Sequence, residues 1–367
     1  MSFMMLAELC DKGSSSLAQK DLLFDSGIYP VYGAAGEITK VDFFHQSKPY
    51  LGLIKDGAGV GRVMKLPANS SVIGTIQYLF PRENVDLKYL YYLIKYLDLG
   101  KSNTGATIPH IYFKDYKKRK VKVRDYSEQK HIGQILELID SHLSTYKNIL
   151  DQYDLLIKSR FVEMFGNPII NDKKYPIFKL KDISQKIGSG FTPRGGDSNY
   201  IEEGIAFIRS MNIYNNTFKK ENLAYIDEFL ANQLSQVELF SGDLLLNITG
   251  ASVARCCTVP DNILPARVNQ HVCIIRQCRI SNVFLEYCLT NESYQEYLLL
   301  LSNKNGATRE ALTKSQVENL EVIFPPLLEI ARFEKIVEQI NKLKSDVQKS
   351  IDETQLLMDS LMQEYFG

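Results

Sequence analysis

The sequence contains no apolar run that approaches the roughly 18 residues of a membrane-spanning helix. Its first residues, MSFMMLAELCDKG, also lack the basic start and the long apolar stretch of a secretory signal peptide. Both absences argue against the membrane and secreted classes of protein. They predict a cytoplasmic protein that has no membrane as a partner.

Patterns for metal binding and for disulfides are missing as well. None of the six cysteines belongs to a C-x-x-C pair, and the five histidines show no H-x-x-H or H-E-x-x-H spacing, so no metal site is expected. The cysteines from position 256 onward lie among strand-like apolar residues, which is typical of buried free thiols in a reducing compartment. The 43 basic residues balance the 43 acidic ones, so only a local gathering of charge can support a nucleic-acid partner.

Motifs of nucleotide binding and catalysis are also absent. There is no strand–GxGxxG–helix pattern, no GxxxxGK[ST] and no GxSxG. The run GAGVG at 57–61 lies between predicted strands without a following helix, which favours a bulge or hairpin. Asn167-Pro168 is a lone dipeptide, without the Asn/Asp-Pro-Pro-aromatic motif of an adenine methyltransferase. With no carboxylate cluster for a nuclease either, the sequence argues against catalysis within this chain.

What the sequence does contain is a repeated pair of long amphipathic stretches, residues 128–166 and 329–367. Apolar residues recur in steps of three and four in both, which predicts long helices that pack on a partner helix. A shift of 201 positions superimposes the two without a gap, down to the closing Phe165-Gly166 and Phe366-Gly367. The residues expected to form the coiled-coil seam, or to bind a partner, are Ile135, Ile139, Tyr146, Leu150, Tyr153, Ile336, Ile340, Leu343, Val347 and Leu357.

A β-rich block precedes each helix, so the chain is predicted to be an internal duplication of the α+β class. The blocks are residues 1–127 and 177–328, and a polar linker covers 167–176. Short apolar runs with turn residues between them predict the strands, and 71–80 is expected to be one of them. Matching segments support the repeat: 180–190 with 6–16, 249–255 with 56–62, 302–308 with 102–107, and Gln270 with Gln77.

The order block, helix, block, helix suggests a geometry. If the two seams pair antiparallel, the helices separate the blocks and a pseudo-two-fold axis crosses the helix pair. A helix of roughly 35 residues spans ~50 Å. Two similar readers joined by such a rod suit a long, regular ligand such as duplex DNA, with its helical repeat of ~34 Å.

Polar, turn-rich segments of the second block carry the side-chain types that hydrogen-bond bases or phosphates. Each residue alone is more typical of a surface or a turn, but their gathering in one block favours a nucleic-acid contact. In the first block, seven of the eleven residues Lys114–Arg124 are basic, which fits either a solvated edge strand or phosphate contact. The candidate DNA-binding residues of both blocks are Tyr32, Lys55, Gln77, Thr107, His110, Lys114, Lys117, Thr192, Arg194, Arg209, Ser210, Asn212, Thr249, Asn269, Gln270, His271 and Arg309.

In these features the chain resembles the specificity (S) subunit of type I restriction-modification systems. The resemblance covers essentially the full chain, and its strength lies in the order of motifs that are individually weak. The segments that carry it are Leu180–Pro193, Ser241–Leu245, Thr249–Arg255 with Arg267–His271, Gly105–Asp115, and Pro325–Glu329 at the entry to the final helix.

The resemblance implies two target recognition domains separated by an antiparallel coiled coil of two helices. Each domain would read one half of a split, asymmetric DNA site, and the helix pair would set the spacer. The subunit would have no catalytic centre of its own. It would assemble with two modification subunits, which methylate adenine with S-adenosylmethionine, and with restriction subunits that use ATP and Mg to translocate and cut DNA. The first block departs from the pattern, because it lacks the clear Thr-Pro and Asn-Gln-His signals of the second.

A second hypothesis from another class remains open: a structural adaptor that bridges protein partners through its coiled coil without reading DNA. The distribution of charge discriminates the two, since DNA reading predicts basic and polar residues on one face of both blocks. A third hypothesis, a stand-alone nuclease or methyltransferase, needs a motif that the sequence lacks.

Overall fold

The computed structural model describes residues 2–22, 27–57, 59–102, 109–276, 279–303 and 310–367. The chain folds into two compact units, each described by itself below. Unit 1 comprises residues 1–149 and 346–367, and unit 2 comprises residues 150–345. Each unit therefore contains one β-rich block together with parts of both long helices.

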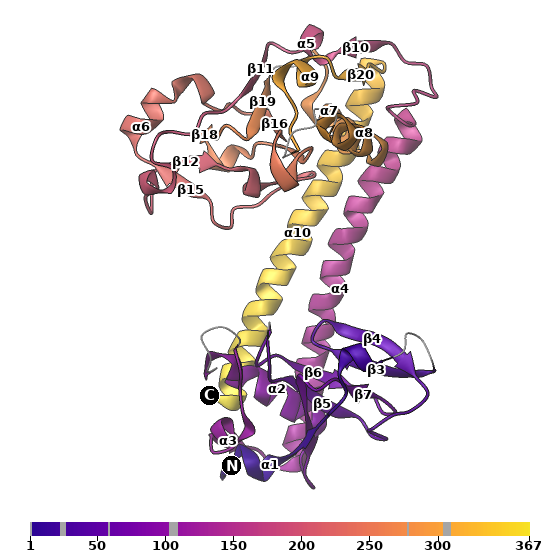
Figure 1. Cartoon of the computed structure of the whole chain (residues 1–367), viewed down its shortest axis with the longest axis vertical. Helices are drawn as coiled ribbons and strands as arrows, with labels where there is room; N and C mark the ends of the chain where they lie inside the picture. Colours follow the sequence, from indigo (N-terminus) through magenta and orange to yellow (C-terminus); the bar gives the residue numbers. More distant parts are fainter. Residues whose placement is uncertain (1, 23–26, 58, 103–108, 277–278, 304–309) are drawn as a thin grey trace. The chain divides into compact units, whose positions relative to one another are not determined.

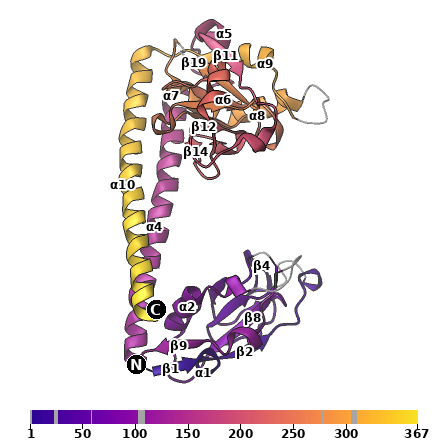
Figure 2. The same ribbon diagram turned by 90° about the vertical axis from the view of Figure 1, so that its left-hand side faces the viewer.

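Short strands and helices make up the block of unit 1 (Figures 1 and 2). In chain order they are β1 (Ser2–Met5), α1 (Leu6–Leu9), β2 (Cys10–Ser14), η1 (Gln19–Asp21), β3 (Tyr29–Gly33), β4 (Gly36–Val41), β5 (Tyr50–Ile54), β6 (Val63–Leu66), β7 (Ser71–Val72), β8 (Ile76–Pro81), α2 (Leu87–Leu97), η2 (Leu99–Ser102), α3 (Phe113–Tyr116) and β9 (Lys120–Val123). A four-stranded antiparallel sheet has the order β2-β8-β5-β6, a three-stranded sheet has the order β4-β3-β7, and β1 pairs with β9.

The block of unit 2 repeats this plan with additions. Its elements are β10 (Ile177–Lys179), α5 (Leu180–Ile183), β11 (Lys186–Ser189), η3 (Gly196–Asn199), β12 (Ile205–Ile208), η4 (Ser210–Asn212), β13 (Ile213–Tyr214), β14 (Thr217–Phe218), β15 (Ala224–Ile226), α6 (Glu228–Gln233), η5 (Ser235–Val237), β16 (Leu244–Asn247), η6 (Gly250–Ser252), β17 (Cys256–Thr258), η7 (Asp261–Ile263), β18 (Ala266–Val268), β19 (Val272–Arg276), α7 (Asn282–Leu289), α8 (Glu292–Asn303), α9 (Lys314–Glu318) and β20 (Glu321–Ile323). The sheet orders are β11-β19-β16-β17, β15-β12-β18, β10-β20 and β13-β14.

The two blocks share one topology, which confirms the predicted duplication. Strand for strand, β2-β8-β5-β6 corresponds to β11-β19-β16-β17, and β4-β3-β7 corresponds to β15-β12-β18. The one parallel pairing described in each three-stranded sheet, β3 with β7 and β12 with β18, is also equivalent. The hairpin β13–β14 and the helix α6 have no equivalent among the described elements of unit 1.

The glycine-rich run of unit 1 and its match in unit 2 adopt the same turn. The Gly61 amide donates to the Ile54 carbonyl at 2.8 Å, and the Ala254 amide donates to the Asn247 carbonyl at 2.9 Å. Gly57, Gly59 and Gly61 all have positive φ angles, a conformation that glycine adopts without strain. The predicted hairpin between strands, here β5 and β6, and the match of 249–255 with 56–62 are therefore confirmed.

One strand prediction was wrong. The stretch 71–80 forms two strands, β7 and β8, which a turn at residues 73–75 separates. β7 joins the three-stranded sheet and β8 joins the four-stranded sheet. Sequence pattern missed this break because buried apolar residues lie on both sides of Gly74 and Thr75: Val72 and Ile73 precede them, and Ile76 follows.

The long helices α4 (Tyr126–Phe165) and α10 (Leu327–Phe366) each have 40 residues, and both ends of α10 lie 201 positions after those of α4. In unit 1 the first half of α4 shares a core with the last turns of α10, including Ile139 and Met362. In unit 2 the last turns of α4 pack on the first turns of α10, with the Phe161 and Phe333 rings 5.6 Å apart. The helices are therefore antiparallel within each unit, as predicted, and Figures 1 and 2 show them side by side.

Most of the predicted seam residues are buried or partly buried, but two are not. Leu343 and Leu357 are exposed, by 47% and 50% of their surface. Met358, one position after Leu357, enters the core of unit 1 instead. Met358, Met362 and Phe366 form an i, i+4 stripe along α10. An α-helix has 3.6 residues per turn, so its buried stripe drifts away from a seam with a strict repeat of 3.5 residues. The remaining predicted seam residues are buried (Ile139, Ile340) or partly buried (Ile135, Tyr146, Leu150, Tyr153, Ile336, Val347).

The cores of the units are apolar. Cys10, Cys256, Cys257, Cys273 and Cys288 are free and buried, as predicted, while Cys278 lies outside the described residues. Within the described ranges, no three His, Cys, Asp or Glu side chains are grouped so that they could hold a metal ion. A search of the same ranges found no helix long and apolar enough to cross a membrane.

Candidate nucleic-acid interface

In unit 2, four loops meet at one edge of the sheets, where β11, β12, β16 and β18 end. Backbone hydrogen bonds join these loops. The Phe191 amide donates to the Val268 carbonyl at 3.0 Å, and the Asn269 amide donates to the Ile208 carbonyl, also at 3.0 Å. The Ile248 amide donates to the His271 carbonyl at 2.9 Å. We call residues 190–194, 209–212, 248–250 and 269–271 the loop edge of unit 2.

The loop edge brings together candidates that lie far apart in the sequence. The Gln270 backbone amide donates to the Thr192 hydroxyl at 3.3 Å, and the Gln270 side chain is exposed. Thr249 Oγ1 and His271 Nδ1 are hydrogen-bonded at 2.6 Å. Exposed Arg194 follows Thr192 in the same loop. Amide, hydroxyl, imidazole and guanidinium groups are therefore displayed on one surface, and these groups hydrogen-bond base edges and phosphates.

Two asparagines among the candidates lie beneath this surface. Asn212 is fully buried, accepts a hydrogen bond from the Arg209 amide and donates to the Lys219 carbonyl. Asn269 is 8% exposed, and its side-chain oxygen accepts from the His271 amide at 3.2 Å. Both side chains hold turns, so the structure places them as supports of the loop edge, in contrast to the expected base contacts.

Arg209 and Ser210 lie at the start of η4. The Arg209 guanidinium lies 5.2 Å from the centre of the Tyr200 ring and donates to the Asn222 carbonyl at 2.6 Å. Its buried Nε has no hydrogen-bond partner. The Ser210 carbonyl accepts from the Asn247 side chain at 2.9 Å, which anchors η4 to the end of β16.

Unit 1 has an equivalent loop edge, where two of these backbone bonds recur. The Lys55 amide donates to the Thr75 carbonyl at 3.0 Å, as Ile248 does to His271. The Ile73 amide donates to the Tyr32 carbonyl at 3.0 Å, as Asn269 does to Ile208. Residues 73–75 of unit 1 therefore occupy the place of residues 269–271 in unit 2.

This equivalence corrects one match made from sequence. Gln270 corresponds to Gly74, whereas Gln77 lies inside β8 at the position of Cys273 in β19. Gln77 is only 7% exposed, and its side-chain oxygen accepts a hydrogen bond from the Tyr116 hydroxyl at 2.5 Å. Gln77 therefore belongs to the core of unit 1. The match from sequence failed because the strand register, and no local pattern, separates these positions.

At the loop edge of unit 1, His110 and Asp56 form a polar contact, with Nδ1 and Oδ1 2.7 Å apart. Asp56 occupies the position of Thr249. An isolated β-bridge joins Asp56 to His110, and another joins Thr249 to Ala311. His110 and Ala311 both lie in the segment before the last small helix of their block. Lys55 Nζ lies 3.6 Å from Asp56 Oδ2. Sequence reasoning missed Asp56, although its match with Thr249 was visible.

The remaining candidates of unit 1 lie around this contact or along α3. Tyr32 is partly buried, and burial together with Glu37 raises the pKa of its hydroxyl. Lys114 is exposed and lies 5.2 Å from the centre of the Tyr112 ring. Lys117 is partly buried at the end of α3. Thr107 and Arg309 lie outside the described residues.

The basic stretch Lys114–Arg124 includes β9, which pairs with β1 in a two-stranded sheet. Val121 and Val123 are buried, whereas Lys120 is exposed and Lys122 partly exposed. This alternation is that of an edge strand with lysines toward solvent, a placement that both alternatives share.

A family model described as the type I restriction modification DNA specificity domain matches residues 1–154 and 171–354. Two relatives from Methanocaldococcus jannaschii are similar to the chain. The type I restriction enzyme MjaVIII specificity subunit is 23% identical over 80% of this chain and 76% of its own length. The MjaIX specificity subunit is 22% identical over 77% of this chain and 69% of its own length.

Solved structures agree in fold. The type I restriction-modification S subunit from M. genitalium covers 100% of this chain and 96% of its own, with a TM-score of 0.64 and 16% identity. A chain from a study of complex assembly and conformational transition in a type I R-M system covers 99% of this chain and 97% of its own, with a TM-score of 0.55 and 14% identity.

The duplicated blocks, each with a polar loop edge, have the fold of a solved type I restriction-modification S subunit. With a family model that matches most of its length, the chain belongs to the type I restriction-modification DNA specificity family. Recognition of DNA sequence is the role that this membership assigns to it.

Proposed function

We propose that this chain is a non-catalytic recognition subunit in which each block reads one half of a bipartite, asymmetric DNA site through its loop edge. The two long helices would set the length of the spacer between the half-sites. Side chains of the loop edges would contact base edges in the grooves, and neighbouring basic residues would contact phosphates.

One observation carries this proposal: the loop edges have the same backbone but different side chains. Asn269, Gln270 and His271 in unit 2 stand where unit 1 has Ile73, Gly74 and Thr75. Thr249 likewise stands where unit 1 has Asp56. A shared scaffold with unlike hydrogen-bonding groups suits the reading of two unlike sequences, because the groups displayed in the groove determine which base pair is accepted.

Partners and cofactors follow from the same proposal. The chain would direct two modification subunits, which methylate adenine with S-adenosylmethionine, and restriction subunits, which use ATP and Mg. The target adenine would be flipped out of the duplex into the modification subunit. The family membership and the names of the relatives support these partners, and no cofactor is assigned to this chain itself.

Exchange of one block tests the proposal. If residues 1–110 are replaced by those of a relative, methylation sequencing of the host genome should show a new sequence in one half-site and the old sequence in the other. A change in both half-sites, or in neither, would contradict the two-reader arrangement. Insertion of one heptad into both α4 and α10 should lengthen the spacer, and an unchanged spacer would contradict its setting by the helices.

A single substitution sharpens the test within unit 2. Gln270→Ala removes an exposed amide from the loop edge and should reduce discrimination at one base pair by roughly tenfold, within the range of one bidentate base contact. Gln185→Ala is the matched control, because Gln185 is an exposed glutamine before β11, at the end of that strand opposite to the loop edge. Equal effects of the two substitutions on methylation specificity would remove the loop edge of unit 2 from base reading.

A further inference from the structure

The hairpin β13–β14, which has no equivalent among the described elements of unit 1, follows directly on the loop edge of unit 2. Asn212, a buried residue of that edge, fixes the end of the hairpin. The Lys219 amide donates to the Asn212 carbonyl at 2.8 Å, and the Asn212 side chain donates to the Lys219 carbonyl at 3.0 Å. β14 also packs on β17, the strand that follows Arg255. Lys219 and Arg255 are thereby carried on two neighbouring strands.

The tip of the hairpin is held to the rest of unit 2. The Asn216 amide donates to the Cys256 carbonyl at 3.0 Å, and the Cys256 amide donates to the Asn215 side chain at 3.2 Å. Asn216 also donates to the buried Glu286 carboxylate of α7 at 3.2 Å, and Asn215 donates to Gln295 of α8 at 3.1 Å. Four hydrogen bonds thus fix the tip on β17, α7 and α8.

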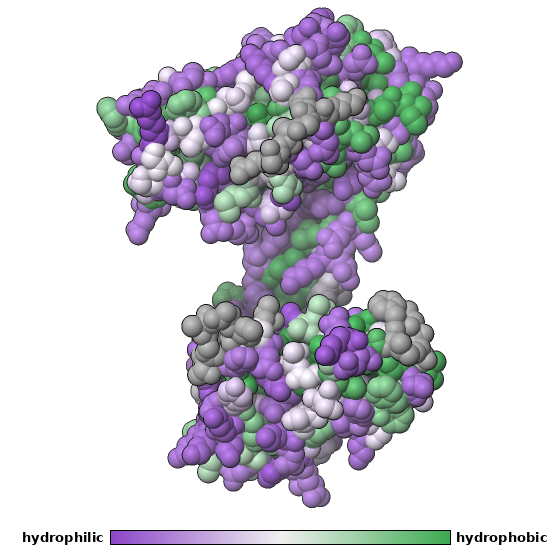
Figure 3. All heavy atoms as spheres, in the orientation of Figure 1, coloured by the Kyte–Doolittle hydropathy of each residue, from purple (hydrophilic) through white to green (hydrophobic). Residues whose placement is uncertain are grey.

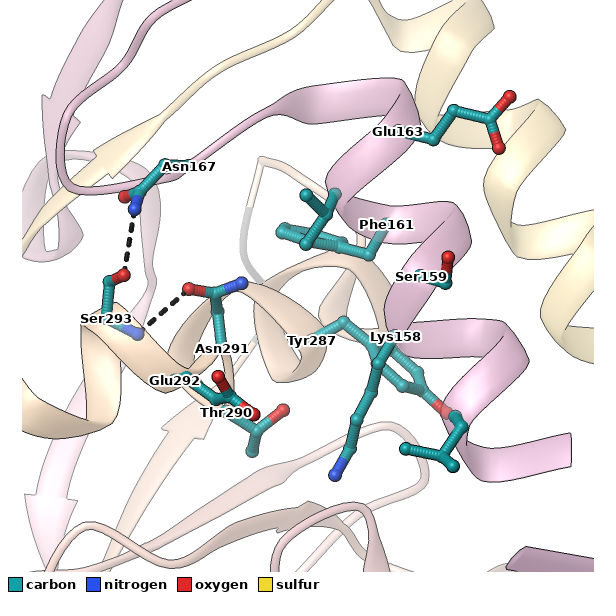
Figure 4. Close-up of a pocket in the computed structure, with 12 residues that line it drawn as sticks. Lys158, Ser159, Phe161, Glu163, Asn167, Tyr287, Thr290, Asn291, Glu292 and Ser293 are labelled. Atoms are coloured by element: carbon teal, nitrogen blue, oxygen red, sulfur yellow. Dashed lines mark hydrogen bonds between the residues drawn. The ribbon is translucent and has the colours of Figure 1, made fainter. Parts of the chain in front are cut away.

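The helices behind the hairpin are fixed in turn. At the start of α8, the Ser293 hydroxyl accepts a hydrogen bond from Asn167 at 2.8 Å, as Figure 4 shows. On α7, the Phe284 ring lies 5.5 Å from the Phe161 ring of α4. The hairpin therefore rests on the packed core of unit 2, and side chains that it carries are held in place.

Two cations share one aromatic ring on this hairpin. Lys219 Nζ lies 4.2 Å and the Arg255 guanidinium 4.4 Å from the centre of the Tyr214 ring. Because both distances are measured to the same ring, the two charges lie closer together than the Debye length of about 10 Å at 0.1 M salt, and they repel. The face of unit 2 in Figure 3 is largely hydrophilic, so a single exposed lysine is ordinary there, but two cations on one ring are not.

Neither cation has a counter-charge of its own. Other arginines of unit 2 form ion pairs, Arg267 with Glu238 and Arg276 with Asp243. Among the described residues, by contrast, no ion pair and no side-chain hydrogen bond of Lys219 or Arg255 is found. Lys219 is exposed and Arg255 is partly exposed, so both can meet a ligand. An anion that contacts both would remove their repulsion, and phosphate oxygens accept hydrogen bonds from ammonium and guanidinium groups.

Unit 1 repeats the arginine but not the arrangement. Arg62 follows Gly61 as Arg255 follows Ala254, and the Gly61 and Ala254 amides make equivalent backbone bonds. The Arg62 guanidinium, however, donates to the Ala34 carbonyl. The repeated arginine therefore binds the backbone of its own block in unit 1, whereas in unit 2 it lies over an aromatic ring.

The two cations adjoin the loop edge of unit 2. The Asn247 amide donates to the Arg255 carbonyl at 2.8 Å, and the Asn247 side chain donates to the Ser210 carbonyl at 2.9 Å. Ser210 belongs to the loop edge, so one asparagine joins the backbone of Arg255 to it. A ligand that meets the loop edge then passes close to both cations.

We propose, on the basis of the proposed function, that Tyr214, Lys219 and Arg255 form a phosphate clamp, which holds the DNA backbone beside the half-site that unit 2 reads. The clamp contacts no base, so it adds the same affinity for every sequence and fixes the position of the loop edge on the duplex. Unit 1 has no counterpart of the clamp among its described residues. The two blocks thus differ in their hold on the backbone as well as in the side chains of their loop edges.

The salt dependence of DNA binding tests the clamp. The full chain with its modification subunits is titrated by fluorescence anisotropy between roughly 50 and 200 mM salt. One labelled duplex carries the site found by methylation sequencing, and the other a scrambled sequence. Lys219→Gln combined with Arg255→Gln should lower the slope of log affinity against log salt by about one, and should weaken binding to both duplexes by roughly tenfold. Arg255→Lys keeps the charge and should keep the slope.

Lys181→Gln combined with Arg279→Gln is the matched control, because it removes the same charge from two exposed residues of unit 2. The Arg279 amide donates to the Ile183 carbonyl of α5, so both control residues lie near α5, at the end of β11 opposite to the loop edge. The control should leave the salt slope and both affinities unchanged. Since neither cation of the clamp has an ion pair to lose, the clamp variant should melt at the temperature of the unchanged chain.

A clamp variant with the slope and affinities of the control would overturn the proposal, and so would a clamp variant with a new half-site in methylation sequencing. Inorganic phosphate is the second probe. If it raises the melting temperature of the unchanged chain but not of the clamp variant, while both bind the duplexes equally, the ligand is a free phosphate and the proposal is wrong. An unchanged chain that does not prefer its own site would refute the proposed function as well, whereas a clamp variant that reads the site with an unchanged slope would refute only this inference.

Discussion

The two blocks have different side chains at one equivalent cross-strand pair. The pair lies at the end of the two central strands of each four-stranded sheet. In unit 1, Tyr50 of β5 faces Phe80 of β8, with the ring centres 6.3 Å apart. In unit 2 the equivalent pair is Asp243 and Arg276, which form an ion pair at 2.6 Å with 1% and 12% of their side chains exposed. One backbone register therefore supports an aromatic pair in one block and a buried ion pair in the other.

A second position shows the same behaviour between the last strand of the sheet and the helix that covers it. Lys65 of β6 lies 4.9 Å from the centre of the Tyr91 ring of α2. At the equivalent place, the Thr258 hydroxyl of β17 donates to the Glu286 carboxylate of α7 at 2.5 Å. Both partners of each pair differ between the blocks, because a new side chain at a packed position requires a compatible neighbour.

The largest expected effect concerns the ion pair that only unit 2 has. Asp243→Ala should reduce the free energy of unfolding of the chain by about 3–5 kcal/mol, since it leaves the Arg276 guanidinium buried without its counter-charge. Chemical denaturation with circular dichroism measures the change.

The matched control places the pair of unit 1 in unit 2. The double variant Asp243→Tyr with Arg276→Phe should recover part of the loss, because an apolar pair removes the unpaired charge. A double variant less stable than Asp243→Ala would show that the surroundings of this position, and not only the pair, differ between the blocks.

The next effect tests the corrected match of Gln77 with Cys273. Gln77→Cys should destabilise the chain by about 1–3 kcal/mol, because the buried Tyr116 hydroxyl loses its acceptor. The sequence of both DNA half-sites should stay unchanged in methylation sequencing. A variant with normal stability and an altered half-site would restore Gln77 as a base-contacting residue.

A smaller effect should appear in the pH dependence of stability. Burial raises the pKa of Glu286 in the folded chain above its ordinary value of 4.5, although hydrogen bonds from Thr258 and Asn216 oppose the shift. The folded state then binds more protons than the unfolded state, so the contribution of this group is lost as the pH rises through the raised pKa. Glu286→Gln removes this titration, and its stability should fall less steeply than that of the unchanged chain between acidic and neutral pH. Parallel curves from thermal melts across this range would contradict the prediction.

The smallest effect concerns the partly exposed pair of unit 1. Lys65→Thr introduces the residue of unit 2 and should cost about 0.5–1 kcal/mol, the range of an exposed cation–π contact. Tyr91→Glu combined with Lys65→Thr builds the pair of unit 2. The double variant should lose less free energy of unfolding than the sum of the losses of the two single variants. Strict additivity in the double-mutant cycle would show that Lys65 and Tyr91 are not coupled.

Local sequence pattern predicted much of the fold. The helical period and the 201-residue offset predicted α4 and α10 almost to their ends, because a long amphipathic stripe is visible in sequence. The turn at 57–61 was also predictable, since glycine marks positive φ angles. Only part of the loop edge could be predicted. The polar segments of the second block were found by residue type, but Asn212 and Asn269 look like surface readers in sequence and are buried supports in the structure.

The amino-acid sequence by itself determined the duplication, the two long helices and the resemblance to the family, because these rest on periodicity and on the order of motifs along the chain. Tertiary structure alone decided which residues of the two blocks are equivalent. Gln270 aligns with Gly74 instead of Gln77 because backbone hydrogen bonds between strands set the register, and these bonds join residues far apart in the chain. It also decided that Tyr96 of α2 donates a hydrogen bond to Gln363 of α10, since two helices must pack before side chains 267 positions apart in the chain can meet.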